Sequence, residues 1–297
     1  MNTPILLLGC NGQLGFELQR ALAPLGQVIA LDHHACDLSD PAALRRQITE
    51  HRPGIIVNAA AYTAVDRAES EPEMANAVNA LAPGVLGEAA ARAGALIVHY
   101  STDYVFDGQS AEPYQESDAP NPLNVYGQSK LAGEQALRAS GAKHLIFRTS
   151  WVFGAHGNNF VKTMLRLATE RETLNVVADQ YGAPTSAALL AEVTAQILTQ
   201  YRPAEQFPFG LYHLTASGAT NWHAYAARVI AAARGAGRPL KLAADGLNAI
   251  PASAYPLPAA RPANSRLDCS LLQRAFGLQL PSWQAGVDRV LQEILRP

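Results

Sequence analysis

Short apolar runs alternate with amphipathic stretches along the first half of the chain. The run Ile5-Leu6-Leu7-Leu8, which ends at Gly9, is typical of a strand buried on both faces, and leucines then recur at helical spacing over residues 14–23. Four more apolar runs follow, at residues 28–31, 54–57, 95–100 and 144–148. Helical segments lie between them, one starting at Ser39-Asp40-Pro41 and a longer one over about 72–93. This order predicts an α/β fold, a doubly wound parallel sheet with helices on both faces.

The pattern loosens after about residue 151. Helices are still predicted near 159–171 and 187–201, and a strand at 210–214, whereas Pro, Ala and Ser dominate an irregular loop over 251–262. We therefore expect residues 1–150 to form the main domain. Residues 151–297 should form mostly a smaller C-terminal lobe, with some elements that return to the main sheet.

Composition narrows the class of protein. The chain has 297 residues, of which 48% are hydrophobic and 16% charged, and its formal net charge is −2. No basic excess favours a nucleic-acid partner, and no 18-residue apolar run indicates a membrane span. The first four residues carry no basic region typical of a secretion signal. We expect a soluble cytoplasmic protein, whose three scattered cysteines fit neither a disulfide framework nor a metal site: Cys10, Cys36 and Cys269.

A glycine loop joins the first strand to the first helix. Gly9, Gly12 and Gly15 form a G-x-x-G-x-x-G pattern that also contains Gln13 and Leu14. Glycines let the backbone turn and let a pyrophosphate approach the N–H groups of the helix start, while Gly15 lets the helix lie close to the strand. The alternative is a glycine-rich turn without a ligand. In this context the loop favours a Rossmann-type dinucleotide site in the main domain, and the smaller lobe would then bind substrate.

Asp32 strengthens that interpretation because it ends the second strand, where an acid can bind the adenosine ribose hydroxyls. A carboxylate there favours NADH over NADPH, although protonated His33 and His34 would offset this preference. The expected cofactor is therefore NADPH or NADH. Two stretches of the sequence are expected to border it, namely Asp37-Leu38, and Ala61, Tyr62 and Thr63 after the third strand.

Tyr126 and Lys130 are spaced to share one face of a helix that Asn124 would start. A lysine near the phenol is expected to lower the pKa of Tyr126 toward the range of a general acid. Thr102 lies at the exit of the fourth strand, hence at the carboxyl edge of the sheet where such folds bind ligands. A Tyr-x-x-x-Lys pair alone is weak evidence, but with the glycine loop and Asp32 it indicates a nicotinamide-dependent oxidoreductase.

With these residues the chain resembles the extended short-chain dehydrogenase/reductases and, within them, the dTDP-4-dehydrorhamnose reductases. The matching segments occur in order along nearly the whole chain: 9–15, 57–66, 99–106, 124–134, 148–152, 179–185 and 261–265. The resemblance implies hydride transfer to the C4 ketone of dTDP-4-keto-6-deoxy-L-mannose, which gives dTDP-L-rhamnose. Tyr126 would donate the proton, Lys130 would hold the nicotinamide ribose, and Thr102 would bind the ketone oxygen.

The same resemblance implies a set of dTDP-sugar contacts. Asp103, Tyr104 and Trp151 would line the sugar pocket, and Arg261 would bind the diphosphate. Trp151 is alternatively a core residue, and Arg261 alternatively forms a surface salt bridge. Some family members are described as magnesium-linked dimers, and Glu293 could serve there, but no acid follows Thr185 until Glu192. We therefore predict no metal site and leave a homodimer open.

Two other functions share this fold. One is a non-catalytic dinucleotide-binding regulatory subunit, against which the retained substrate motifs argue. The other is a 4,6-dehydratase, an epimerase or a reductase of a different nucleotide sugar. Related dehydratases carry an Asp-Glu pair after the active-site threonine, whereas here Asp103 is followed by Tyr104. The missing second acid favours simple ketone reduction.

Overall fold

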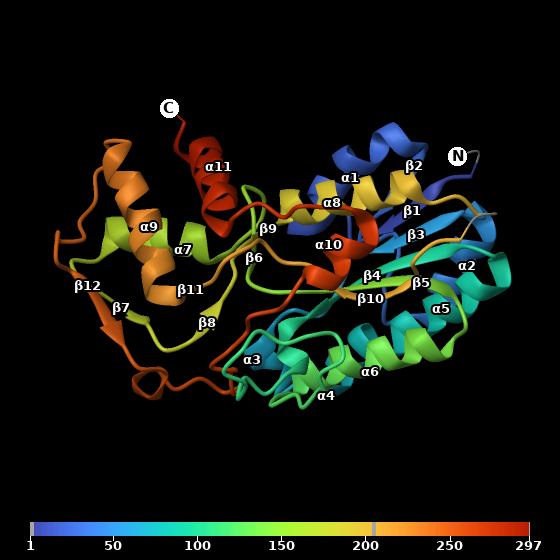
Figure 1. Cartoon of the computed structure of the whole chain (residues 1–297), viewed down its shortest axis with the longest axis horizontal. Coiled ribbons are helices and arrows are strands. Elements are labelled where there is room, and N and C mark those ends of the chain that lie inside the picture. The colour runs from blue at the N-terminus through green and yellow to red at the C-terminus, as the bar shows by residue number, and fades with distance from the viewer. Residues whose placement is uncertain (1–2, 204–205, 297) are drawn as a thin grey trace.

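The computed structural model describes residues 3–203 and 206–296. Met1 and Asn2, part of the segment considered for a secretion signal, lie outside the described residues. Six parallel strands form the main sheet in the order β10-β5-β4-β3-β1-β2 (Figure 1). Their bounds are β1 Ile5–Leu8, β2 Val28–Leu31, β3 Ile55–Asn58, β4 Leu96–Thr102, β5 Lys143–Thr149 and β10 Gly210–His213. The predicted parallel sheet is confirmed.

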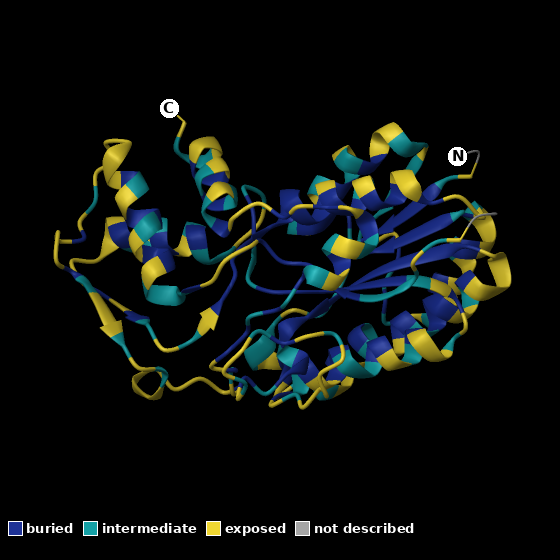
Figure 2. Ribbon diagram, viewed as in Figure 1, coloured by how far each residue is buried: buried dark blue, intermediate teal, exposed yellow. Residues whose placement is uncertain are grey.

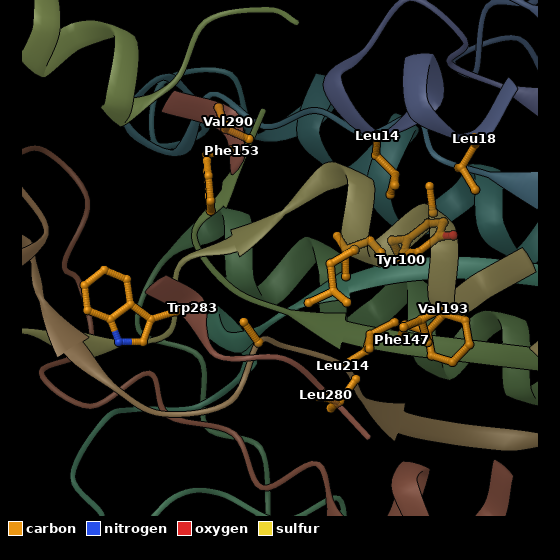
Figure 3. Packing of buried hydrophobic residues seen from close by; sticks show 14 of the residues in the cluster. Leu14, Leu18, Tyr100, Phe147, Phe153, Val193, Leu214, Leu280, Trp283 and Val290 are labelled. Carbon is orange, nitrogen blue, oxygen red and sulfur yellow. The ribbon is translucent and has the colours of Figure 1, made fainter. Parts of the chain in front are cut away.

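Both faces of this sheet are buried, as the unbroken apolar runs predict. Ile5 and Leu7 belong to one hydrophobic cluster, whereas Leu6 and Leu8 belong to another on the opposite face. Helices α1 (Gln13–Leu22) and α8 (Ala187–Gln200) cover the first face, and α2 (Pro41–His51), α5 (Ala82–Ala93) and α6 (Val125–Ala139) cover the second (Figures 1 and 2). In Figure 3, Leu14 and Leu18 point from α1 toward Tyr100 of β4.

Local signals fix where several helices begin. Asp40 caps α2 through the Ala42 N–H with Pro41 as first helical residue, and Asn124 caps α6 through the Gly127 N–H. The long segment predicted over about 72–93 is continuous but contains a π-helical turn, Ala77–Leu81, between α4 (Pro72–Asn76) and α5. Pro83, which has no N–H to donate, is the second residue of α5 after that turn. A short helix, α3 (Val65–Ala68), precedes α4.

The smaller lobe is built from helices and very short strand pairs. Strand β7 (Leu174–Val177) pairs with β12 (Leu247–Ile250), β8 (Tyr181–Gly182) with β11 (Thr220–Asn221), and β6 (Val152–Phe153) with β9 (Thr185–Ser186). The remaining helices are α7 (Phe160–Glu170), α9 (Trp222–Gly235), α10 (Ser270–Phe276) and α11 (Trp283–Leu295). As expected, elements after residue 150 return to the main sheet: β10 extends it, α10 packs on β10, and α8 packs on α1.

The strand order creates a crevice at the carboxyl edge of the sheet. The chain leaves β1 toward β2 on one side and later returns to β3 on the other, so the segments after β1 and β3 diverge. Gly9 follows β1, Asn58 ends β3 and Thr102 ends β4. The predicted candidate residues therefore meet at one edge. Over the described ranges of the chain, none of the helices combines the length and apolar character required to cross a membrane.

Candidate active site

A cleft of about 990 Å³ opens at this edge, within the size range of ligand sites. Residues of the main sheet and of the smaller lobe both line it. Most of the predicted site residues are among them: Gly9, Gly12, Gln13, Leu14, Asp32, Asp37, Leu38, Ala61, Tyr62, Thr63, Thr102, Asp103, Tyr104, Tyr126, Lys130 and Trp151. Gly15 and Arg261 lie outside the lining.

The glycine loop forms one wall of the cleft. Gly9 has a φ of 78°, and a Cβ there would come within 2.8 Å of the Ala60 backbone nitrogen. A Cβ on Gly15 would collide with the carbonyl oxygen of Gly9, so this glycine keeps α1 against the loop, as predicted. Gly12 is the N-cap of α1, no side chain caps this helix, and its first turn has no acidic residue. The leading N–H groups therefore remain available to an anion such as a diphosphate.

The adenosine end of the cleft is acidic. Asp32 accepts hydrogen bonds from the Ala35 N–H at 2.9 Å and from the Asn11 side-chain amide at 3.1 Å. The Ala35 N–H contributes most to holding the pKa of Asp32 below its usual range. Asp37 lies in the same lining, whereas Lys130 is the one lysine or arginine among the lining residues. Two carboxylates at this end can accept hydrogen bonds from hydroxyl groups and would repel a phosphate.

Tyr126, Lys130 and Thr102 come together on the opposite wall. The Thr102 hydroxyl donates to Asp103 Oδ1 at 3.0 Å and accepts from the Tyr104 N–H at 3.1 Å. Lys130 is buried and its Nζ donates to the Tyr100 carbonyl oxygen at 2.6 Å. The ring of Tyr104 meets that of Tyr126 edge-on, with centroids 5.8 Å apart. The Tyr126 phenol, the Lys130 amine and the Thr102 hydroxyl thus belong to residues that line the same cleft.

The smaller lobe closes the far side with two stacked indoles. Trp151 stacks on Trp222 of α9 at 3.6 Å between ring centroids, and both rings line the cleft. Trp151 has a φ of 49°, an unfavourable conformation for a residue with a side chain. A Cβ on Gly182 would lie 2.6 Å from the indole of Trp151, so the absence of a side chain there makes room for it. One ring face of Trp151 is therefore already covered.

Comparisons with known proteins agree with this geometry. The family model described as RmlD substrate binding domain matches residues 1–296. The chain is 56% identical to dTDP-4-dehydrorhamnose reductase of Salmonella typhimurium over 98% of this chain and 97% of that protein. It is 49% identical to the Burkholderia thailandensis enzyme of the same name, over 98% and 99% of the two chains. The chain belongs to the RmlD family of dTDP-4-dehydrorhamnose reductases.

Solved structures extend the comparison. A crystal structure of the Bacillus anthracis dTDP-4-dehydrorhamnose reductase in complex with NADP superimposes with a TM-score of 0.90 at 36% identity, covering 99% of this chain and 100% of that one. The Streptomyces venezuelae dTDP-glucose 4,6-dehydratase DesIV has a TM-score of 0.78 at 19% identity, over 98% and 96% of the chains, which shows a shared fold alone. As a member of the RmlD family, the chain is an oxidoreductase.

The electrostatics of this RmlD family member correct one expectation. Burial raises the pKa of Tyr126 to about 12, and the Asp103 carboxylate acts in the same direction. The predicted lowering by Lys130 is wrong in this structure. Lysine and tyrosine share a helix face, but the ammonium is directed to the Tyr100 carbonyl oxygen and toward His99. Spacing along a helix predicts the shared face and leaves the direction of a long side chain open.

Arg261 lies in an ion pair outside the residues that line the cleft. Its guanidinium makes a bidentate ion pair with Asp66, with N–O distances of 2.9 and 2.7 Å, and Nη1 also donates to the Ala259 carbonyl oxygen. The pair joins helix α3 to the irregular loop that precedes α10. Neither residue belongs to the lining of the cleft. The geometry matches the salt-bridge alternative, and the contact with a diphosphate stays a prediction.

Two polar residues in or beside the cleft, Asn79 and Thr149, were not predicted. Asn79, buried in the π-helical turn, donates to the Tyr62 carbonyl oxygen and accepts from the Tyr62 N–H, both at 2.9 Å, which fixes the segment after β3. Ser101 and Thr149 line the cleft with buried hydroxyls that have no hydrogen-bond partner. Trp222 was missed as well, because nothing near it in the sequence marks it as a neighbour of Trp151.

Proposed function

We propose that the chain reduces the C4 ketone of dTDP-4-keto-6-deoxy-L-mannose to give dTDP-L-rhamnose, with NADH or NADPH as reductant. The observation that carries this proposal is the convergence of Thr102, Tyr126 and Lys130 on the cleft that the glycine loop opens. Membership of the RmlD family and 56% identity to a protein named dTDP-4-dehydrorhamnose reductase support the choice of substrate.

The residues present fit a dinucleotide. The uncapped start of α1 and the bare Cα of Gly12 would receive the diphosphate, and Asp32 the adenosine ribose. When bound, the nicotinamide supplies the hydride that reduces carbon 4 of the sugar. The Bacillus anthracis relative is named as a complex with NADP. Here the acidic lining at Asp32 and Asp37 supports a preference for NADH.

The protein's own groups would handle the oxygen of the ketone. Thr102 and Tyr126 bind that oxygen, and the Tyr126 O–H passes its proton to it as the alkoxide forms. Lys130, whose Nζ is held on the Tyr100 carbonyl oxygen, would bind the nicotinamide ribose, as the resemblance implies. Burial favours the neutral phenol at rest, so Tyr126 is ready to donate rather than to accept a proton.

The sugar would lie between the catalytic wall and the lobe. We assign Asp103, Tyr104, Trp151 and Trp222 to its pocket, and Arg261 to the diphosphate after release from Asp66. Residues 1–150 would thus form the dinucleotide-binding domain and residues 151–297 most of the substrate lobe. The aromatic ring of Tyr104, where a dehydratase would carry a second acid, supports reduction over elimination. A homodimer and a cytoplasmic location stay predictions, which sedimentation and cell fractionation would test.

The test is turnover followed at 340 nm with NADH and with NADPH, using the 4-keto sugar made in situ. Tyr126→Phe should bind either cofactor like the unaltered chain and lose at least about 10²-fold in rate, because a general acid contributes on that scale. Near-normal turnover by this variant would refute Tyr126 as proton donor. No turnover by the unaltered chain, despite cofactor binding, would direct the assignment to another nucleotide sugar.

A further inference from the structure

A buried polar row lies directly behind the catalytic lysine. Asn58 ends β3, His99 lies beside it in β4, and Lys130 reaches them from α6; each is 1% exposed. The Asn58 amide nitrogen is 3.2 Å from His99 Nδ1, and His99 Nε2 is 3.4 Å from Lys130 Nζ. Side chains buried so completely normally form a defined hydrogen-bond network. Neither Asn58 nor His99 has a role in the mechanism above.

The backbone decides which way this row is oriented. Asn58 Oδ1 accepts the Ala60 N–H at 3.2 Å, so the amide NH₂ group is the one that faces His99. An NH₂ group donates, and His99 Nδ1 must therefore offer a lone pair. Burial and the charge of Lys130 both lower the pKa of His99, which keeps the imidazole neutral. Its single ring hydrogen then lies on Nε2, the nitrogen that faces Lys130.

This assignment places an N–H against the lysine amine. An ammonium has only hydrogens to present, so it meets His99 donor to donor and holds on to the Tyr100 carbonyl oxygen instead. A neutral amine would accept the His99 Nε2–H. The arrangement therefore favours the neutral amine, consistent with a Lys130 pKa that burial lowers to about 8.

The other charged groups around Lys130 act differently. Glu134, one turn along α6, favours the ammonium, but both its oxygens are taken by Arg148 of β5 at 2.9 and 2.7 Å. Asp103, which follows β4, acts on Tyr126. Two groups contact the amine itself, the Tyr100 carbonyl oxygen and His99. The carbonyl can only accept, so the tautomer of His99 determines whether Lys130 faces a second acceptor or a donor.

We infer that His99, oriented by Asn58, is a positioning residue that presents an N–H to Lys130 and makes it a readier proton donor. The inference rests on the proposed function. After Tyr126 has given its proton to the sugar oxygen, Lys130 gives one proton to the tyrosinate. The resulting neutral amine accepts the His99 Nε2–H, and water returns a proton to the amine when the product leaves.

The first experiment reads the tautomer directly, by ¹⁵N-resolved NMR of the histidine rings in the unaltered full-length chain. His99→Gln identifies the His99 signals. We expect hydrogen on Nε2. A hydrogen on Nδ1 would overturn the inference, whatever the enzyme's activity. This readout also separates the two proposals, because it stands even if the chain fails to reduce the 4-keto sugar.

The second experiment inverts the row. Asn58→Asp keeps the oxygen that accepts the Ala60 N–H but turns the NH₂ group into an acceptor, so the His99 hydrogen should move to Nδ1. Nε2 would then accept from the Lys130 ammonium. The apparent pKa of the alkaline limb in the pH profile of kcat/KM should increase by about one unit, at the low end of the shifts that a close partner causes. KM should stay unchanged.

The added carboxylate also favours the ammonium by charge alone, so the control is the double variant Asn58→Asp, His99→Gln. It keeps the charge and removes the imidazole. If the apparent pKa of the alkaline limb increases clearly less in the double variant than in Asn58→Asp, the role of His99 is supported. An equal increase in both variants overturns it. So does an unchanged pKa in Asn58→Asp when NMR shows that the His99 tautomer has inverted. Near-UV circular dichroism and cofactor binding verify that each variant is folded.

Discussion

The two walls of the cleft satisfy their polar groups to different degrees. On the cofactor side, Asp32 has both carboxylate oxygens hydrogen-bonded, and the glycine loop is fixed by contacts of its own backbone. On the substrate side, the Ser101 hydroxyl, the Thr149 hydroxyl and Asp103 Oδ2 are buried without a hydrogen-bond partner. Native proteins leave few such groups, since each costs about 1–3 kcal/mol.

Backbone conformation follows the same division. The positive φ of Gly9 costs little because glycine lacks a Cβ, whereas Trp151 adopts a φ of 49° with a full side chain. The glycine loop of the wall that we propose for the cofactor therefore turns at little backbone cost, while the leading N–H groups of α1 stay available to a ligand. The wall that we propose for the substrate holds one strained backbone position and three unpaired polar groups, and a sugar bound as proposed would offer hydrogen-bond partners to those groups.

The largest effect should come from breaking the cofactor wall with Gly15→Ala. The new methyl group collides with the Gly9 carbonyl oxygen, which is backbone and cannot rotate away. We expect a loss of about 3 kcal/mol in the free energy of unfolding, at the upper end for overpacking. Cofactor binding, followed by nucleotide fluorescence, should weaken with it. Urea unfolding measures the stability.

Gly235→Ala is the matched control for that variant. Gly235 ends α9 and has nothing within 4 Å of the position a Cβ would take. Alanine should therefore raise stability by up to about 1 kcal/mol, because it restricts the unfolded chain and favours helix. Gly15→Ala with native stability and native cofactor affinity would contradict the close approach of α1 to the loop.

The cofactor wall was largely predictable from sequence because its signals are local. Gly9, Gly12 and Gly15 lie in one turn, and Asp32 follows the next strand, so spacing alone brings them to one edge. The same holds for Tyr126 and Lys130 on one helix. Their chemistry was less predictable, since the pKa of Tyr126 depends on burial and on Asp103, which belongs to a different segment.

The substrate wall was less predictable because distant segments build it. Two helices, α7 and α8, and six strands, β6 to β11, separate Trp151 from Trp222 in the sequence. Strands of two residues such as β8 and β11 carry no periodicity. Arg261 shows the same limit. Its place in the sequence suited a diphosphate, but its partner Asp66 lies 195 residues away.

An intermediate effect is expected from Asp103→Asn, which tests how much stability the protein loses by burying an ionised carboxylate in this wall. Burial raises the pKa of Asp103 to about 6, above its value in an unfolded chain. Folding therefore favours the neutral acid: the contribution to stability is full below about pH 4 and is lost as pH rises through 6. The unaltered chain should lose on the order of 2 kcal/mol over this range, and the variant should not.

Thermal unfolding at a series of pH values measures this difference, and Asp107→Asn provides a control of opposite sign. The Gln109 N–H lowers the pKa of Asp107, so that carboxylate stabilises the fold at neutral pH and its replacement should destabilise. Equal pH dependence in the unaltered chain and in Asp103→Asn would show that Asp103 carries no such cost.

The smallest effect concerns the ion pair between Arg261 and Asp66, at the border of the two walls. Hydrogen bonds from Arg261 lower the pKa of Asp66, so its contribution to stability is present above about pH 4 and is lost as the pH falls below that. Because Asp66 is 37% exposed, solvent screens the pair, and Asp66→Asn should cost at most about 1 kcal/mol at pH 7. The difference in stability between the variant and the unaltered chain should shrink as the pH falls toward 3.

Kinetics of the same variant decide what Arg261 does. If Arg261 binds the diphosphate during turnover, Asp66→Asn releases it for that contact, whereas Arg261→Lys loses the bidentate fork that matches a phosphate. We therefore expect Arg261→Lys to raise KM for the dTDP-sugar several-fold and Asp66→Asn to leave it unchanged. Equal increases in KM would restrict Arg261 to anchoring the irregular loop on α3. The substrate wall would then lack a cationic diphosphate partner among its predicted residues, and the difference between the two walls would be greater still.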